Sequence, residues 1–99
     1  MSAYIVFIRE QITDTEELLT YAKLVRETFV AHPVKILAER GERIVLEGPA
    51  IEGAVILEFP STEAALAWYH SPAYQAAAIH RFKGANTLAF VIEGVHPAQ

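Results

Sequence analysis

The sequence predicts an α+β domain whose elements follow the order β-α-β-β-α-β. Three observations predict it: short apolar runs rich in β-branched and aromatic residues, two longer stretches with helical spacing, and turn residues between them. The 99 residues suffice for one domain, spanning positions 1–99. Hydrophobic residues make up 53% of the chain, above the ~45–50% of ordinary globular chains. This excess predicts an apolar surface that a partner chain covers.

The first half of the chain contains a predicted strand at residues 3–8 and a predicted helix at residues 14–31. Both faces of the strand are apolar, so both faces need to be covered. Thr13 and Glu16 match a capping box at the start of the helix, and Pro33 closes it. The predicted apolar stripe of this helix consists of Leu18, Ala22, Val25 and Phe29.

Three further strands are predicted. Residues 34–40 mix apolar and charged side chains, which is typical of an edge strand. Residues 54–59 form a strand that is apolar apart from Glu58, and residues 86–93 form the last strand. The tail at 94–99 is short, and we expect it to be loose.

The second helix is predicted in two pieces. Ser61 is placed to cap the first piece, which ends at Tyr69. A Ser-Pro pair then interrupts the helix, with Ser71 as the new cap and Pro72 at the first helical position. The second piece is predicted to end at Gly84 in the left-handed conformation.

This order of elements suits the ferredoxin-like arrangement, a four-stranded antiparallel sheet with two helices on one face. Right-handed crossovers place both helices on the same side of the sheet. The opposite face is then bare, although the first, third and fourth strands are apolar there. We therefore expect a homodimer in which two copies pack their sheet faces together.

Three segments of the chain resemble a known family: EFPSTEAALAWYHSPAYQ, LAFVIEG and VLEG. They are similar to the uncharacterised family called domain of unknown function thirteen-thirty, within the dimeric α+β barrel superfamily. The resemblance implies a ferredoxin-like subunit and a homodimer with packed sheets. Relatives in the superfamily include cofactor-free monooxygenases, muconolactone-type isomerases, haem-binding chlorite dismutases and proteins without a known reaction, so the fold leaves the function open. The family commonly has a glycine-rich turn at the position of Ala31-His32-Pro33. We therefore transfer no residue role from the family to this part of the rim of the expected pocket.

The candidate ligand-binding residues gather around the helix break. We expect Trp68, Tyr69 and Tyr74 to line a pocket that holds a flat or apolar ligand. Ordinary packing of the helix on the sheet is the alternative. Arg81 follows Tyr74 by seven residues and can share its helix face, where a guanidinium suits a carboxylate or enolate. In the alternative, Arg81 is solvated or pairs with a nearby acid.

Three residues are candidates for moving a proton: His70, His80 and Glu58. His70 lies directly before the helix break, where it can act as a general base or remain an exposed helix-end imidazole. Glu58 is the one charge inside its strand. It is a buried carboxylate of raised pKa if it faces the helices, and it has no special role if it lies in water.

Several classes of function are not indicated. The formal net charge is −4 with no run of Lys or Arg, which argues against a nucleic-acid or membrane partner. No cysteine is present, which fits a cytoplasmic setting, and no glycine-rich phosphate cradle occurs. We expect no cofactor and no metal, since metal-ligand spacing is absent among His32, His70, His80 and His96.

Two functions remain open. The first is a homodimer with a small-molecule pocket between the sheet and the second helix, taking a small apolar or carboxylate-bearing ligand. This protein would bind its ligand or turn it over as a cofactor-free enzyme of the monooxygenase or isomerase type. The second is a non-catalytic dimeric binding or assembly module, which explains the apolar excess without any pocket.

Overall fold

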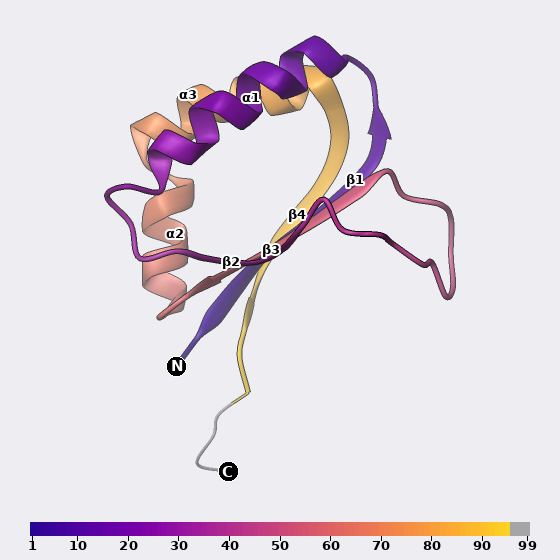
Figure 1. Cartoon of the computed structure of the whole chain (residues 1–99). Coiled ribbons are helices and arrows are strands. Elements are labelled where there is room, and N and C mark those ends of the chain that lie inside the picture. The colour runs from indigo at the N-terminus through magenta and orange to yellow at the C-terminus, as the bar shows by residue number, and fades with distance from the viewer. Residues whose placement is uncertain (96–99) are drawn as a thin grey trace.

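The structure is a computed structural model, and it describes residues 1–95. Its elements are β1 (Ala3–Ile12), α1 (Thr15–Thr28), β2 (Lys35–Glu39), β3 (Gly53–Phe59), α2 (Thr62–Tyr69), α3 (Pro72–Gly84) and β4 (Ala85–Glu93) (Figure 1). The predicted β-α-β-β-α-β order is confirmed, with the second helix divided into α2 and α3. The expected tail at 94–99 lies almost wholly outside the described residues, as does His96.

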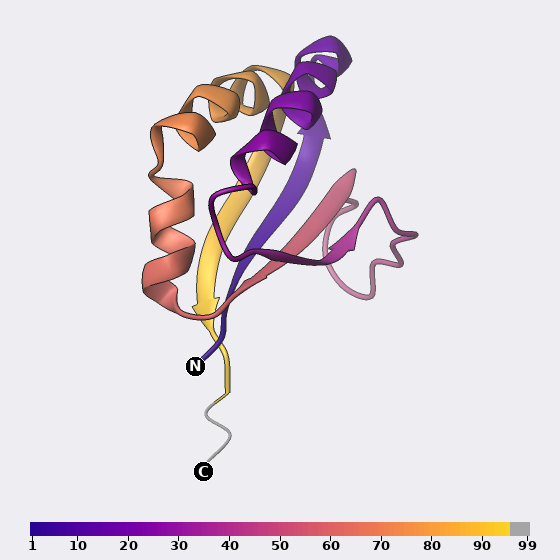
Figure 2. The ribbon, with the colours of Figure 1, turned by 60° about the vertical axis from the view of Figure 1, so that its left-hand side comes forward.

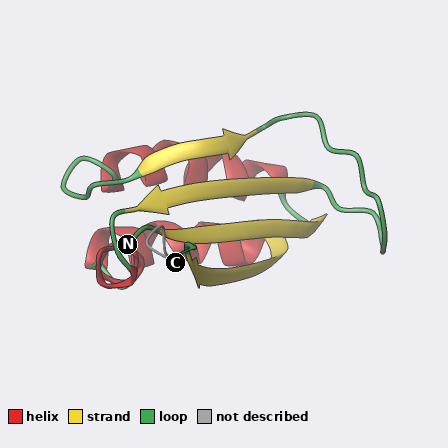
Figure 3. Ribbon diagram, turned by 90° about the horizontal axis from the view of Figure 1, so that it is seen from below, coloured by secondary structure: helices red, strands yellow, loops and turns green. Residues whose placement is uncertain are grey.

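All four strands form one antiparallel sheet in the order β2-β3-β1-β4. This is the ferredoxin-like arrangement, and β2 lies at an edge of the sheet as predicted. The three helices cover one face of the sheet (Figures 2 and 3). The segment at 40–52 joins β2 to β3 and extends away from the helices beyond the sheet (Figure 1).

The core lies between the sheet and the helices. Alternate residues of β1 point into it, and Ala3, Ile5 and Phe7 are buried while their neighbours are half-buried. From β3, Leu57 and Phe59 join the same layer. The helices contribute Tyr21, Ala65, Trp68, Tyr74, Ala77 and Ala78.

The opposite face of the sheet carries no helix (Figure 3). The register of β1 against β4 pairs Tyr4 with Ile92, Val6 with Phe90 and Ile8 with Leu88. Paired residues of antiparallel strands share a face, so these six side chains form one apolar row on the open side. The row on β4 remains about half exposed, with Phe90 at 47% and Ile92 at 54%.

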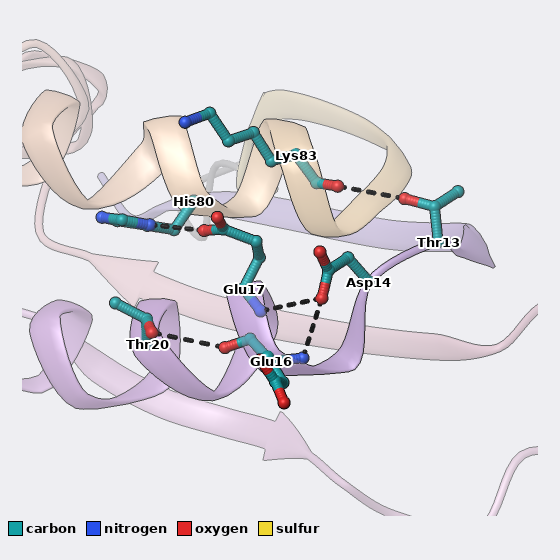
Figure 4. Close-up of polar contacts among 7 residues, drawn as sticks. All are labelled: Thr13, Asp14, Glu16, Glu17, Thr20, His80 and Lys83. Atoms are coloured by element: carbon teal, nitrogen blue, oxygen red, sulfur yellow. Dashed lines mark hydrogen bonds and ion pairs between the residues drawn. The ribbon is translucent and has the colours of Figure 1, made fainter.

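The start of α1 differs from the predicted capping box. Asp14, not Thr13, is the N-cap: its carboxylate accepts hydrogen bonds from the backbone N–H groups of Glu16 and Glu17 (Figure 4). A carboxylate at this position also interacts favourably with the positive end of the helix dipole. Thr13 instead donates its hydroxyl to the carbonyl of Lys83 and so ties the start of α1 to the end of α3 (Figure 4).

Helix α1 ends at Thr28, earlier than predicted, and Pro33 does not stop it. The Thr28 hydroxyl donates to the carbonyl of Val25 at 2.6 Å. The backbone N–H of Phe29 turns to the carbonyl of Arg26, three residues back, so the helix tightens and ends there. The buried residues of α1 are Leu18, Tyr21 and Thr28. Of the predicted apolar stripe only Leu18 is among them, so the face that α1 turns to the core differs from the predicted one.

The break between α2 and α3 is confirmed. Ser61 caps α2 by accepting from the N–H of Ala64, and Ser71 caps α3 by accepting from the N–H of Tyr74. Pro72 occupies the first turn of α3, where its missing N–H costs nothing. After the break the chain changes direction, so that α3 lies alongside α1 (Figures 1 and 2).

Gly84 has a different role from the one predicted. Among the described residues, Gly48 is the only glycine with positive φ, so Gly84 is not a left-handed cap. A Cβ on Gly84 would lie 2.8 Å from the side chain of Leu18 and 3.0 Å from the carbonyl oxygen of Asp14. Glycine is required here because α3 and the start of α1 approach each other closely.

Candidate functional site

A buried chain of polar groups joins α1 to α3. The Nε–H of Arg81 donates to the hydroxyl oxygen of Tyr74 at 3.2 Å. That oxygen lies 3.0 Å from the hydroxyl of Tyr21, with which it shares a second hydrogen bond. All three side chains are buried. The predicted pairing of Tyr74 and Arg81 on one helix face is therefore present, and Tyr21 is its third member.

Arg81 is the only buried charged residue among the described residues, with 4% of its surface exposed. Its guanidinium carbon lies 5.0 Å from the ring centre of Phe7 and 4.8 Å from that of Phe82. No carboxylate of the described residues lies within 4.0 Å of it, since the one ion pair there joins His80 to Glu17. Cation–π contacts of ~0.5–2 kcal/mol offset only part of the several kcal/mol that burying a charge costs.

The two tyrosines of this polar chain, Tyr21 and Tyr74, keep their phenol protons at neutral pH. Burial raises the pKa of Tyr21 well above its usual range. Burial likewise raises the pKa of Tyr74, although the neighbouring Arg81 cation and the hydrogen bonds oppose that rise. Both hydroxyl groups are therefore neutral hydrogen-bonding groups, and Arg81 is the only charge in the chain of polar contacts.

A cleft of about 480 Å³ lies between α1 and the sheet. Arg81, Tyr21 and Trp68 line its buried side. Its walls are mainly apolar, with α1 on one side and β1, β2 and β3 on the other. The wall residues include Phe7, Leu18, Val25, Phe29, Val55 and Leu57.

The pocket was predicted between the sheet and the second helix, whereas this cleft lies mainly between the sheet and α1, and the two pieces of the second helix supply only Trp68 and Arg81 to its lining. A second, smaller hollow of about 220 Å³ does lie between α2 and β4, and Tyr69 and His70 line it. The predicted ligand-binding residues are thus divided between two places: Trp68 and Arg81 line the cleft, Tyr69 lines the hollow, and Tyr74 lines neither. The helix break does not account for this division, because the adjacent α2 residues Trp68 and Tyr69 line different spaces, while Trp68 from α2 and Arg81 from α3 line the same one.

Trp68 and Tyr74 are core residues as well as candidate site residues. Both are fully buried, and their ring centres lie 4.1 Å apart. The indole N–H of Trp68 donates to the hydroxyl of Thr28 at 2.9 Å. The packing alternative weighed for these aromatics is therefore observed for both of them.

None of the three proton-transfer candidates lines the cleft. His80 projects from α3, and its Nδ1 lies 2.6 Å from a carboxylate oxygen of Glu17 on α1 (Figure 4). His70 is exposed at the end of α2. Glu58 does not face the helices: the register places it opposite Tyr4, on the open side of the sheet. Its alternation with the buried Leu57 and Phe59 explains this position.

Sequence reasoning missed several residues of the cleft. Tyr21 was not singled out, although it follows Leu18 by three residues and so shares a helix face with it. Thr28 does not line the cleft itself but accepts a hydrogen bond from Trp68, which does; it was missed because Trp68 lies 40 residues away in the sequence. The lining by Arg9, Arg26, Arg40 and Arg43 was also missed, because these residues come from separate elements that only the fold brings together.

Neither a metal-ion cluster nor a membrane-spanning helix is found in the described part of the chain. No group of three or more His, Cys, Asp or Glu among residues 1–95 is placed to hold a metal ion. Over the same residues, every helix is too short or too polar to cross a membrane.

The family model described as "Domain of unknown function (DUF1330)" matches residues 2–95, so the chain belongs to this family. No curated protein matches the chain.

Solved structures show the same fold at low sequence identity. A protein of unknown function from Rhodopseudomonas palustris is 16% identical, with a TM-score of 0.77 over 97% of this chain and 84% of the other. A dimeric ferredoxin-like protein of unknown function from Jannaschia sp. CCS1 is 10% identical, with a TM-score of 0.75 over 95% and 100%. SnoaB, a cofactor-independent oxygenase from Streptomyces nogalater, is 11% identical, with a TM-score of 0.66 over 96% and 94%.

Proposed function

We propose that the protein is a homodimer that binds a small, partly apolar, carboxylate-bearing molecule in the cleft between α1 and the sheet. The observation that carries this proposal is the state of Arg81. Its side chain is buried, lines the cleft and has no carboxylate partner among the described residues.

The energetics of Arg81 favour an anionic ligand. An unpaired buried charge costs several kcal/mol, and folding alone does not require a cation here, since a methionine of similar length would fill the same space. Only Nε of the guanidinium has a hydrogen-bond partner among residues 1–95, so the two terminal nitrogens remain available. A carboxylate in the cleft can accept from both of them, and such bidentate pairs are strong and directional.

The dimensions and walls of the cleft favour a ligand that is otherwise apolar. Its volume of about 480 Å³ falls within the ~300–1,000 Å³ typical of small-molecule sites. Tyr21 also lines the cleft, and its neutral hydroxyl is linked to Arg81 through the hydroxyl of Tyr74. A ligand with a carboxylate at one end and a hydrocarbon body matches both parts of the cleft.

The homodimer forms, in this proposal, through the open faces of two sheets. The apolar row on β1 and β4 supports it, because a face of this kind is unusual on a monomer. The dimeric ferredoxin-like structures from other organisms, similar in fold alone, are consistent with it. A cytoplasmic setting, expected from the lack of cysteine, belongs to the same proposal.

Turnover without a cofactor is the finer form of the proposal. A guanidinium that binds a carboxylate also stabilises an enolate oxygen, which is the charge that develops in oxygenation or isomerisation of a carbon acid. SnoaB, which shares the fold, is a cofactor-independent oxygenase. Because His70, His80 and Glu58 lie away from the cleft, the arrangement supports anion stabilisation more strongly than proton abstraction by any of them.

The alternative is a dimeric module without a ligand. It is favoured by the complete burial of Trp68 and Tyr74, which fill the layer between helices and sheet. In this reading the cleft is a packing defect, and Arg81 is held by its aromatic neighbours alone.

Calorimetric titration with octanoate separates the two functions. The variant Arg81→Met removes the charge, and Arg81→Lys keeps the charge but loses the paired donors. We expect the wild-type protein to bind, Arg81→Met to bind ~10–150-fold more weakly, and Arg81→Lys to fall between them. Lys83→Met is the matched control, since Lys83 is an exposed cation of the same helix outside the cleft.

Near-ultraviolet circular dichroism checks that each variant keeps its packed aromatic core. Octanoate binding that is equal in the wild type and in Arg81→Met would exclude Arg81 as the anchor. No heat or stability change with octanoate or any other carboxylate would favour the module without a ligand.

A further inference from the structure

All five arginines of the chain line the cleft, and none of its three lysines does. The arginines come from separate elements: Arg9 from β1, Arg26 from α1, Arg81 from α3, and Arg40 and Arg43 from the segment that follows β2. The chain as a whole has a formal net charge of −4, yet only two acidic residues, Glu39 and Glu52, line the cleft beside them. The cleft is therefore a positive region on a negative protein.

The arginines are arranged in depth. Arg81 is the buried arginine of the lining. Arg26, Arg40 and Arg43 are exposed and so belong to the solvent-facing part of the lining, called the mouth below, and Arg9 is half-buried. The apolar walls supplied by α1 and the sheet lie among the same lining residues. The lining of the cleft thus combines one buried cation, apolar walls and several exposed cations.

The outer arginines are not neutralised by their neighbours. Among residues 1–95 the single ion pair joins His80 to Glu17, so no arginine there forms a salt bridge. Arg43 donates from Nη1 to the carbonyl of Gly41, which is a neutral partner. Glu52, one of the two acidic residues of the lining, accepts the backbone N–H of Ile12. These cations therefore remain available to a ligand.

We infer that the ligand is a dianion, with one carboxylate at each end of a short hydrocarbon segment. This inference rests on the proposed function and narrows its ligand class from carboxylates to dicarboxylates. The buried carboxylate binds Arg81 through paired hydrogen bonds, and the outer carboxylate interacts with the arginines at the mouth. Arginine suits both positions because its weakly hydrated, planar guanidinium pairs with carboxylates better than the ammonium group of lysine does.

The two ends of such a ligand should respond differently to salt. The pair at Arg81 is shielded from water, so ions in solution screen it little. The interactions at the mouth are exposed, and each such pair is worth only a few-fold in affinity, most of which is lost at high ionic strength. The protein should therefore prefer a dianion only at low salt, whereas ligand affinity should depend on Arg81 at low and high salt alike.

The test compares suberate with its monomethyl ester, which has the same length and one charge fewer. We expect wild-type protein to bind suberate about three- to tenfold more tightly than the ester at low salt. The variant Arg40→Gln/Arg43→Gln should lose most of this preference, because Arg26 is then the only exposed arginine left in the lining. The variant Lys23→Gln/Lys83→Gln removes the same charge outside the cleft and should keep the preference.

The outcomes distinguish this inference from the proposed function. If Arg81→Met weakens both ligands but wild-type protein shows no preference for suberate, the proposed function stands and the dianion inference is wrong. If the lysine variant loses the preference for suberate as fully as the arginine variant does, the preference reflects net charge alone, and the dianion inference is also wrong. If Arg81→Met binds both ligands as well as the wild type, the proposed function itself fails.

Discussion

Replacing Ile92 with alanine tests the proposed sheet-to-sheet dimer. Ile92 lies on β4, opposite Tyr4 on β1, in the apolar row of the open face. It keeps 54% of its surface exposed in the single chain. If two sheets pack together, this remaining surface is buried in each subunit. The substitution therefore removes part of the free energy of burial in both subunits of the dimer.

The expected loss follows from the exposed area. Full burial of an isoleucine side chain is worth ~1.5–3 kcal/mol, and about half of it remains to be buried at this position. Alanine retains a small part of that gain, so each subunit loses ~0.5–1 kcal/mol and the dimer loses ~1–2 kcal/mol. This corresponds to a dimer dissociation constant raised roughly five- to thirtyfold, and more if the interface cannot close the space left behind.

Sedimentation velocity over a concentration series measures this constant. Ile79→Ala is the matched control, because Ile79 on α3 is the same residue type, is 51% exposed, and lies on the helical layer away from the open face. The reasoning is refuted if Ile92→Ala dimerises as tightly as the wild type, or if Ile79→Ala weakens the dimer to the same extent. A folded wild-type monomer at micromolar concentration would refute it as well.

Three other predictions concern the stability of the subunit. Thr28→Val should lower the free energy of unfolding by ~1–3 kcal/mol, because it leaves the buried indole N–H of Trp68 without an acceptor; urea unfolding measures this. Gly84→Ala should lower it by ~1–3 kcal/mol, because the added methyl group overlaps the Leu18 side chain, and thermal unfolding reports the loss. Stability should fall as the pH rises above about 10, because unfolded chains release the phenol protons that buried Tyr21 and Tyr74 retain, and urea titrations at increasing pH measure the slope.

Each of these predictions has a control within the chain. Thr20→Val removes a comparable hydroxyl from the exposed side of α1, where it bonds only the carbonyl of Glu16, and should change stability little (Figure 4). Gly41→Ala adds a methyl group with nothing within 4 Å and should be close to neutral. For the pH dependence, Tyr21→Phe should reduce the alkaline slope by ~1.4 kcal/mol per pH unit, and an unchanged slope would contradict the linkage.

Local signals allowed most of the fold to be predicted. Ser61 and Ser71 each precede a helix and supply the side-chain acceptor that its first turn needs, so both helix starts were readable. The β-α-β-β-α-β order, with right-handed crossovers, indicated a sheet with both helices on one side. These features depend on residues that are close together in the sequence, and the structure reproduces them.

The errors and omissions of the sequence prediction share one cause. Where two local arrangements were equally favourable, tertiary contacts determined which one formed. Thr13 and Asp14 are both good caps, and the hydrogen bond from Thr13 to the carbonyl of Lys83 decides between them. Gly84 carries an ordinary C-terminal signal, but its role is set by the approach of Leu18 from another helix. The contact of Tyr21 with Tyr74 spans 53 residues and left no local pattern in the sequence.

The candidate site was predicted in part for the same reason. Tyr74 and Arg81 share a helix, so their contact followed from helical spacing alone. The cleft beside them depends on how far α1 stands from the sheet and on which side chains fill that space. The position of the cleft was therefore beyond the reach of the sequence pattern, and so was its lining by every arginine in the chain.

An NMR titration that follows the arginine side-chain N–H signals tests the central claim most directly. Arg81→Lys assigns the Arg81 Nε–H signal, which is buried and hydrogen-bonded to Tyr74. Saturating octanoate should shift that signal and slow the exchange of the terminal guanidinium protons with water. If the Arg81 signals stay unchanged while octanoate binds elsewhere, the cleft is not the carboxylate site.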